Sequence, residues 1–196
     1  MDIESPRLLL VPFDLPLLEA TQAGDLADVG ALLNAAIPAG WPSEGVREWQ
    51  LPEQIARLNR EPDQLPWLGR LILLRRPRAL IGGINLKGAP DARGRVEIGY
   101  EIVEAFRRKG YASEAVEALC QWCFAQPQVT AVYARTQAGN AISQHMLQRL
   151  GFARREIEQH PRLGEMIVWV RPKPPRGEIL LIARTVHRLS RGVAMT

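Results

Sequence analysis

Three consecutive cations and a glycine, Arg107, Arg108, Lys109 and Gly110, stand immediately before a stretch of apolar residues at helical spacing. Cations at the N-terminus of a helix are unfavourable by themselves, because the macrodipole already places partial positive charge there. The arrangement becomes favourable when an anion lies across residues 107–112, where it meets the cations, the dipole and free backbone N–H groups together. The pattern indicates a site for a phosphate-bearing ligand, and a solvated basic turn is the alternative that the same residues allow.

A second candidate for chemistry is the pair Cys120 and Cys123, whose C-x-x-C spacing also occurs in redox and metal sites. Both cysteines fall inside the helical stretch, and a zinc site needs two further ligands. The three histidines, His145, His160 and His187, show no ligand spacing. We therefore interpret the two thiols as packing residues and expect no metal site.

The composition is that of one globular domain. Of the 196 residues, 46% are hydrophobic and 23% are charged, and no apolar run approaches the ~20 residues that cross a bilayer. The first residues, MDIESPRLLLVPF, lack a basic segment followed by an apolar one, so we expect no secretory signal and a cytoplasmic protein. The net charge of +4 and the pI of about 9.5 are modest, and they suit an anionic small ligand as well as a nucleic acid.

The elements that must position these residues are predicted from the spacing of apolar residues, which is typical of strands in some segments and of helices in others. Runs of β-branched and aliphatic residues predict strands at 7–11, 69–74, 79–86, 96–104, 129–136, 152–159 and 165–172. Helical spacing predicts helices within 15–34, broken at its glycines, at 46–59, from Ala112 to the residue before Pro127, and from the cap Asn140 to Gly151. The strand–helix–strand crossover in the middle implies one parallel pair in an otherwise antiparallel sheet. The expected fold class is α/β (α+β), with a mixed sheet flanked by about four helices.

A change of composition divides the chain near its end. The segment RPKPPRG has the residues of a linker, so we expect a domain over residues 1–172 and a tail over residues 173–196. Apolar residues in the tail recur at helical spacing, although ILLIART would also suit a strand. The tail could pack on the domain or on a second subunit, which leaves a homodimer open.

The segment around the cations resembles a known family. Arg107-x-x-Gly110-x-Ala112, directly after a strand and opening a helix, is similar to the R/Q-x-x-G-x-G/A loop of the GNAT superfamily of acyl-CoA-dependent N-acyltransferases. The segment NAISQHMLQRLGF resembles the fourth helix of that family, in the form N-x-x-S-x-x-x-L-x-x-L-G-F. The stretches SPRLLLVPF and GEMIVWVRP resemble the RimJ/RimL-type branch, which contains ribosomal-protein N-terminal acetyltransferases. The resemblance spans residues 3 to 172.

The resemblance implies a GNAT fold whose central parallel strands splay apart and admit the pantetheine arm of acetyl-CoA. Backbone groups near Ile102 and Val103 would bind the arm, amides of residues 108–112 would bind the diphosphate, and Asn140 would reach the pantetheine amides besides capping its helix. The implied cofactor-binding residues are Ile102, Val103, Arg107, Arg108, Lys109, Gly110, Tyr111, Ala112, Asn140 and Ser143. The family pattern often has proline where Glu104 stands, a departure that puts little in doubt.

The implied chemistry is attack by a neutral amine on the thioester, which benefits from a base because most amines are protonated at neutral pH. Glu97 is the predicted base, and Ser143 is predicted to protonate or hydrogen-bond the leaving thiolate. Alternation places Glu97, Gly99 and Glu101 on one face of their strand, without showing which face meets the acceptor. Direct transfer requires no metal.

The predicted activity is therefore transfer of an acetyl group from acetyl-CoA to a primary amine, either a protein N-terminus or a small molecule. Four tryptophans, Trp41, Trp49, Trp67 and Trp169, are candidates both for walls of the acceptor pocket and for the core. One alternative is a catalytically silent acyl-CoA sensor or scaffold of the same fold. A nucleic-acid or ribosome-surface binder is disfavoured, because no aromatic residues interleave with the arginines of the tail.

Overall fold

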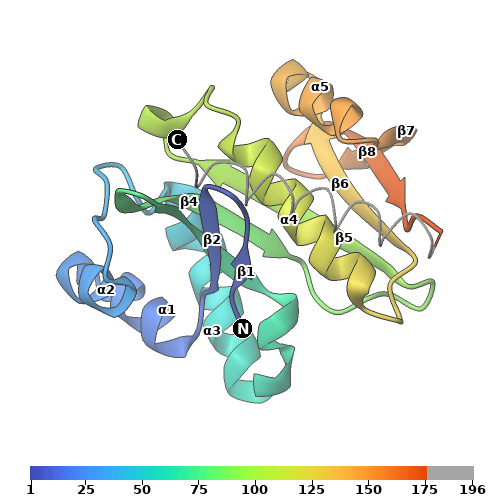
Figure 1. Cartoon of the computed structure of the whole chain (residues 1–196). Helices are drawn as coiled ribbons and strands as arrows, with labels where there is room; N and C mark the ends of the chain where they lie inside the picture. The colour runs from blue at the N-terminus through green and yellow to red at the C-terminus, as the bar shows by residue number, and fades with distance from the viewer. Residues whose placement is uncertain (176–196) are drawn as a thin grey trace.

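The centre of the molecule is one eight-stranded sheet with the order β1-β2-β3-β4-β5-β6-β8-β7. Figure 1 shows β1 and β2 on one side of the molecule and β7 and β8 on the other. The structure is a computed structural model that describes residues 1–175. The strands are β1 (Ile3–Glu4), β2 (Leu8–Pro12), β3 (Gly69–Arg75), β4 (Arg78–Leu86), β5 (Arg95–Ile102), β6 (Ala131–Gln137), β7 (Ala153–His160) and β8 (Gly164–Pro172). The α-helices are α1 (Leu15–Gln22), α2 (Leu26–Leu33), α3 (Leu51–Arg60), α4 (Tyr111–Ala125) and α5 (Ala141–Arg149). Shorter turns are the π-helical η1 (Val46–Gln50) and the 3₁₀ turns η2 (Pro62–Trp67) and η3 (Glu104–Phe106).

The predicted parallel pair is β5 and β6, which the helix α4 connects, and the other pairs in the sheet are antiparallel. The pairing runs from Arg95 opposite Ala131 to Ile98 opposite Ala134 and then stops. Both strands continue, β5 to Ile102 and β6 to Gln137. The two strands therefore diverge at their C-terminal ends, as the resemblance implies, and leave backbone groups without sheet partners.

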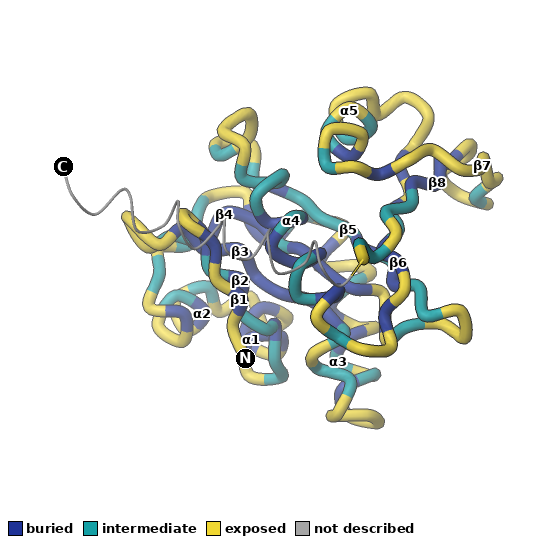
Figure 2. The backbone as a smooth tube through the Cα atoms, turned by 45° about the vertical axis from the view of Figure 1, so that its right-hand side comes forward, coloured by how far each residue is buried: buried dark blue, intermediate teal, exposed yellow. Residues whose placement is uncertain are grey.

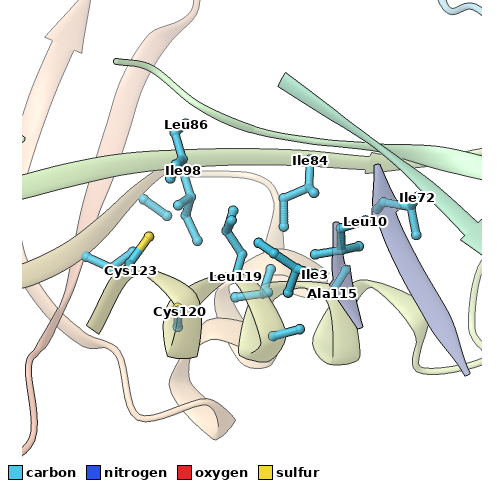
Figure 3. Packing of buried hydrophobic residues seen from close by; sticks show 14 of the residues in the cluster. Ile3, Leu10, Ile72, Ile84, Leu86, Ile98, Ala115, Leu119, Cys120 and Cys123 are labelled. Atoms are coloured by element: carbon cyan, nitrogen blue, oxygen red, sulfur yellow. The ribbon is translucent and has the colours of Figure 1, made fainter. Parts of the chain in front are cut away.

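The helices cover the two faces of the sheet separately. One apolar cluster packs α4 and α5 against one face, and Figure 3 shows Ala115, Leu119 and Cys123 of α4 lying against Ile84 and Ile98 of the strands. A second cluster packs α1, α2 and α3 against the other face. Figure 2 shows the buried strands between these two layers, with exposed residues along the loops. Burial beneath both layers holds the central strands rigid where the divergence begins.

The alternation of β5 assigns its side chains to these two faces. Val96, Ile98 and Ile102 belong to the cluster under α4. Glu97 and Glu101 must therefore point to the face that α1, α2 and α3 cover. The structure thus shows which face of the sheet Glu97 and Glu101 occupy, which the alternation alone does not.

Most element boundaries agree with the sequence predictions, with differences that have local causes. The helical region 15–34 breaks at Gly24, whose φ of 76° ends α1 and which precedes the Asp25 cap of α2. The predicted strand 96–104 ends at Ile102, because residues 104–106 turn into η3. The tail predicted for residues 173–196 lies outside the described residues from position 176 onward. Among the described helices, none has the length and apolar character to cross a membrane.

Candidate active site

The divergence of β5 from β6 presents backbone groups of alternate β5 residues. The Lys87 amide donates to the Glu97 carbonyl at 3.0 Å, and the Val103 amide donates to the Ile81 carbonyl at 2.9 Å. These bonds direct the backbone of odd-numbered β5 residues toward β4. The backbone groups of Tyr100 and Ile102 consequently point toward β6, beyond the last paired residue.

This arrangement supports one of the two predicted strand contacts better than the other. The Ile102 backbone faces the gap, as predicted, although its carbonyl accepts a hydrogen bond from Arg107 Nε at 2.8 Å. The Val103 amide is bonded to β4, and the Val103 carbonyl accepts from the Phe106 amide at 2.9 Å. Tyr100 is therefore better placed than Val103 as the second backbone contact, and the role assigned to Val103 stays a prediction.

The predicted anion loop leads directly into α4. Lys109 Nζ donates to the Ala105 carbonyl at 3.1 Å, and Arg107 is turned toward Ile102 as described above. Among the described residues, Arg108 makes no hydrogen bond or ion pair, and its φ of 59° is unusual for a residue with a side chain. Gly110, with a φ of 79°, begins the helix.

The start of α4 differs from the starts of α1, α2 and α5. In those three helices the side chains of Asp14, Asp25 and Asn140 accept a hydrogen bond from the first turn. No side chain caps α4. The first amides of a helix have no partner within the helix, so the uncapped turn can bind an anion. This open turn and the free Arg108 fit the diphosphate of a coenzyme.

Arg7, from the turn between β1 and β2, braces this loop. Its Nε lies 2.6 Å from Glu114 Oε2, its Nη1 donates to the Lys109 carbonyl at 3.1 Å, and its guanidinium lies 4.7 Å from the Tyr111 ring centre. Ser5 Oγ donates to the same glutamate at 2.7 Å. Sequence reasoning missed this residue, because no local pattern links positions about one hundred residues apart.

The start of α5 approaches the diverging strands from the α4 side of the sheet. Asn140 Oδ1 accepts a hydrogen bond from the Ser143 amide at 3.1 Å, which confirms the predicted cap. The Tyr100 side chain packs against the cluster on this face. Burial raises the pKa of Tyr100, and the side chain of Ser143 partly opposes this increase. The contacts of Asn140 and Ser143 with the coenzyme stay predictions.

Glu97 and Glu101 of β5 lie on the face of the sheet that α1, α2 and α3 cover, and their carboxylates have different partners. The Arg135 guanidinium donates to both oxygens of Glu97, at 3.1 and 2.7 Å, and its Nη1 lies 3.5 Å from Glu158. Glu101 accepts a hydrogen bond from the Ser43 hydroxyl, which lies 2.9 and 3.1 Å from its two oxygens. A proton transferred to Glu97 would have to displace a bidentate arginine contact, so the geometry does not favour the predicted base role.

Two neighbouring cavities open on this face, and Glu101 lines both of them. The larger, about 470 Å³, lies between the loop of residues 39–43 and the end of β5, and extends to Arg107. The smaller, about 160 Å³, is lined by η1 and by Gly83, Asn85 and Gly99 of β4 and β5. Glycines in its floor leave room that side chains would fill.

Of the four candidate tryptophans, Trp41 lines the larger cavity and is also buried in the core. Trp67 packs against Trp122, and the indole of Trp169 donates to Thr136. Trp49 is 58% exposed beneath the guanidinium of Arg162. Neither cavity is lined by these three tryptophans.

The cysteines are buried packing residues, as predicted. Cys120 and Cys123 are free thiols in the cluster beneath α4. Burial raises the pKa of both thiols, that of Cys123 to about 12, so they stay protonated and poor as nucleophiles or ligands. Within residues 1–175, no group of three potential metal ligands comes together.

Comparison with known proteins agrees with this geometry. Residues 7–153 match the acetyltransferase (GNAT) domain. The chain belongs to the GNAT family. It is 31% identical to the uncharacterized N-acetyltransferase YjdG of Bacillus subtilis (strain 168), over 156 residues that cover 76% of this chain and 88% of YjdG. The family membership predicted from the motifs is confirmed.

Solved GNAT structures share the fold. RimL, a ribosomal L7/L12 α-N-protein acetyltransferase in complex with coenzyme A, superposes with a TM-score of 0.61 at 16% identity, covering 88% of this chain and 98% of that one. A GNAT acetyltransferase from Bacillus anthracis gives a TM-score of 0.60 at 20% identity, covering 88% and 99%. The microcin C7 self-immunity acetyltransferase MccE, in complex with acetyl-CoA and AMP, gives 0.60 at 15% identity, covering 85% and 92%. The likeness to these three structures shows the shared fold, and the RimJ/RimL-type branch stays a prediction from the motifs.

Proposed function

We propose that this GNAT protein transfers the acetyl group of acetyl-CoA to a primary amine by direct attack of the amine on the thioester. The observation that carries the proposal is the divergence of β5 and β6 beside the uncapped start of α4. One molecule of acetyl-CoA could then place its pantetheine arm between the strands and its diphosphate at the start of the helix. RimL and MccE, which share the fold, were solved in complex with coenzyme A and with acetyl-CoA and AMP, respectively, and this supports a coenzyme of the same class.

The coenzyme would be held by groups that the fold already orients. The amides of residues 108–112 and the Arg108 guanidinium would receive the diphosphate, because an uncapped helix start attracts anions. Backbone groups of Tyr100 and Ile102 would pair with the pantetheine amides, much as a further strand would. Lys109 and Arg107 add positive charge while tied to neighbouring carbonyls.

On the acceptor side, Glu101 is better placed than Glu97 to take the proton of the amine. Glu101 lines both cavities, of which the larger extends toward the anion loop and the smaller has glycines in its floor. An amine bound where the two cavities meet would therefore lie beside the Glu101 carboxylate. The Ser43 hydroxyl holds that carboxylate in place. Glu97 is committed to Arg135 and ties β5 to β6 near the last paired residues, Ile98 and Ala134.

On the other face, Ser143 would stabilise the leaving thiolate. It lies in the first turn of α5, and its amide is fixed by the Asn140 cap. Hydrogen bonds from oriented donors are worth most where negative charge develops during the reaction. The acceptor itself would be a protein N-terminus or a small-molecule amine, since the smaller cavity is sized for the amine end of either.

Two measurements test the proposal. Calorimetry with acetyl-CoA should show binding, and free-thiol release across a panel of amines and peptides should show turnover with at least one acceptor. Binding without thiol release on any acceptor would favour the silent acyl-CoA sensor. No binding of acetyl-CoA would reject the site assignment altogether.

A further inference from the structure

The side chain of Asn85 is a buried polar group that borders the smaller cavity. Asn85 is only 9% exposed and lines this cavity together with Glu101, yet its amide makes no hydrogen bond within the described residues. Buried polar groups in native proteins almost always have a partner. This amide is therefore expected to bond to the molecule that occupies the cavity.

The register of the sheet places Asn85 close to Glu101 on the same face. Ile84 and Leu86 belong to the cluster beneath α4, so Asn85 points to the opposite face, as Glu101 does. Asn85 lies opposite Gly99, two residues from Glu101, which corresponds to about 7 Å along the strand. An unbonded amide and a carboxylate therefore border the same cavity a short distance apart.

The absence of a side chain at Gly99 lets the Asn85 amide lie against β5. A Cβ atom at position 99 would be 2.7 Å from Asn85 Oδ1, closer than such atoms pack in proteins, and 3.6 Å from Lys87 Cε. Lys87 also lines the cavity, and its backbone pairs with Glu97, four residues from Glu101. Along β5, the cavity is thus bordered first by the carboxylate, then by the amide, and then by the lysine.

We propose that Asn85 determines which amines the site accepts, an inference that rests on the proposed acetyl transfer. The acceptor amine lies at Glu101, and the Asn85 amide donates a hydrogen bond to a carbonyl oxygen on the carbon next to that amine. With a hydrogen bond of about 3 Å at each end, the separation along the strand fits a compact α-amino carbonyl group. An acceptor without that oxygen leaves the Asn85 amide without a partner, and this is how a polar site rejects an analogue.

Lys87 gives the second part of the preference. Its positive charge lies beyond Asn85 as counted from Glu101, and within the described residues it forms no ion pair. A second cation on the acceptor would be repelled by this charge. The accepted class is therefore an amine with a neighbouring carbonyl group, from a small α-amino amide or from the first residue of a polypeptide, and diamines are disfavoured.

The test is Asn85→Leu, which keeps the approximate size of the side chain and removes its amide. The acceptors are glycinamide and isobutylamine, which has as many non-hydrogen atoms and the same branching but no carbonyl. We expect kcat/KM for glycinamide to fall about tenfold and that for isobutylamine to stay within about twofold of wild type. The ratio of variant to wild type for each acceptor removes the difference in basicity between the two amines.

Two further variants separate the donor from the charge. Asn85→Asp keeps the shape but cannot donate, so it should lose glycinamide as Asn85→Leu does, and it carries the test if Asn85→Leu does not fold. Lys87→Gln should raise kcat/KM for 1,3-diaminopropane by about threefold or more and leave glycinamide nearly unchanged. The matched control is Asn59→Leu on the exposed side of α3, which should keep wild-type rates with all three amines.

A short peptide with a free α-amine distinguishes the two sources of the carbonyl group. Faster turnover of the peptide than of glycinamide would indicate a polypeptide, and the reverse would indicate a small amide.

Three results would overturn the inference. The first is an equal loss for glycinamide and isobutylamine in Asn85→Leu, as a purely structural role would give. The second is an Asn85→Asp enzyme as fast as wild type with glycinamide. The third is a Lys87→Gln enzyme with no gain for the diamine. Wild-type protein that releases no thiol with any amine would instead refute the proposed function itself, together with this inference.

Discussion

Arg108→Gly should separate stability from coenzyme affinity at the anion loop. Arg108 has a φ of 59°, a conformation that costs a residue with a side chain about 1–2 kcal/mol. Glycine adopts it freely, but loses about 0.5–1 kcal/mol more conformational entropy on folding. The two effects nearly cancel, so the free energy of unfolding should stay within about 1 kcal/mol of wild type or increase.

The same substitution removes a cation that no other described side chain engages. A hydrogen bond to a charged group contributes about 1.5–3 kcal/mol, and the exposure of Arg108 favours the lower end of that range. A loss of about 1.5 kcal/mol weakens binding of acetyl-CoA about tenfold. Because the contact is exposed, the difference should shrink as the salt concentration increases.

Calorimetry with acetyl-CoA and with S-acetylpantetheine measures the affinities, and thermal unfolding measures the stability. S-acetylpantetheine lacks the diphosphate, so Arg108→Gly should bind it as wild type does. Arg108→Lys keeps the charge and the strained backbone, and should bind acetyl-CoA within about threefold of wild type. Unchanged affinity of Arg108→Gly for acetyl-CoA, or an equal loss for both ligands, would show that the diphosphate lies elsewhere.

Three further outcomes follow from the site. Gly110→Val should abolish acetyl-CoA binding in calorimetry while circular dichroism shows a folded protein, because a branched side chain at a φ of 79° must displace the loop. Glu101→Gln should lose rate mainly at low pH, where the amine is protonated, whereas Glu97→Gln should give a pH-independent ratio to wild type; the reverse would return the base role to Glu97. Truncation after Pro175 should leave the Kd for acetyl-CoA unchanged, and a weaker Kd would connect the tail to the site.

Local patterns were sufficient for the elements and for one half of the site. The spacing of apolar residues predicted α4, and Gly110 with the cations before it marked the start of that helix. The strand–helix–strand order predicted the parallel pair, because a crossover returns the chain in the same direction. The cap Asn140 followed from its position before an apolar period. These features depend on residues near one another in the chain.

The other half of the site depends on contacts between distant segments. Arg7 forms an ion pair with Glu114, and the Ser43 hydroxyl donates a hydrogen bond to Glu101. A period of two shows that Glu97, Gly99 and Glu101 share a face, but the same alternation is compatible with either face of the sheet. Which helices pack on which side, and where β5 parts from β6, are set by the packing of the two apolar clusters as a whole. For that physical reason the start of α4 at Gly110 could be predicted from the sequence, whereas the position of Glu101 beside the two cavities is decided only by the folded chain.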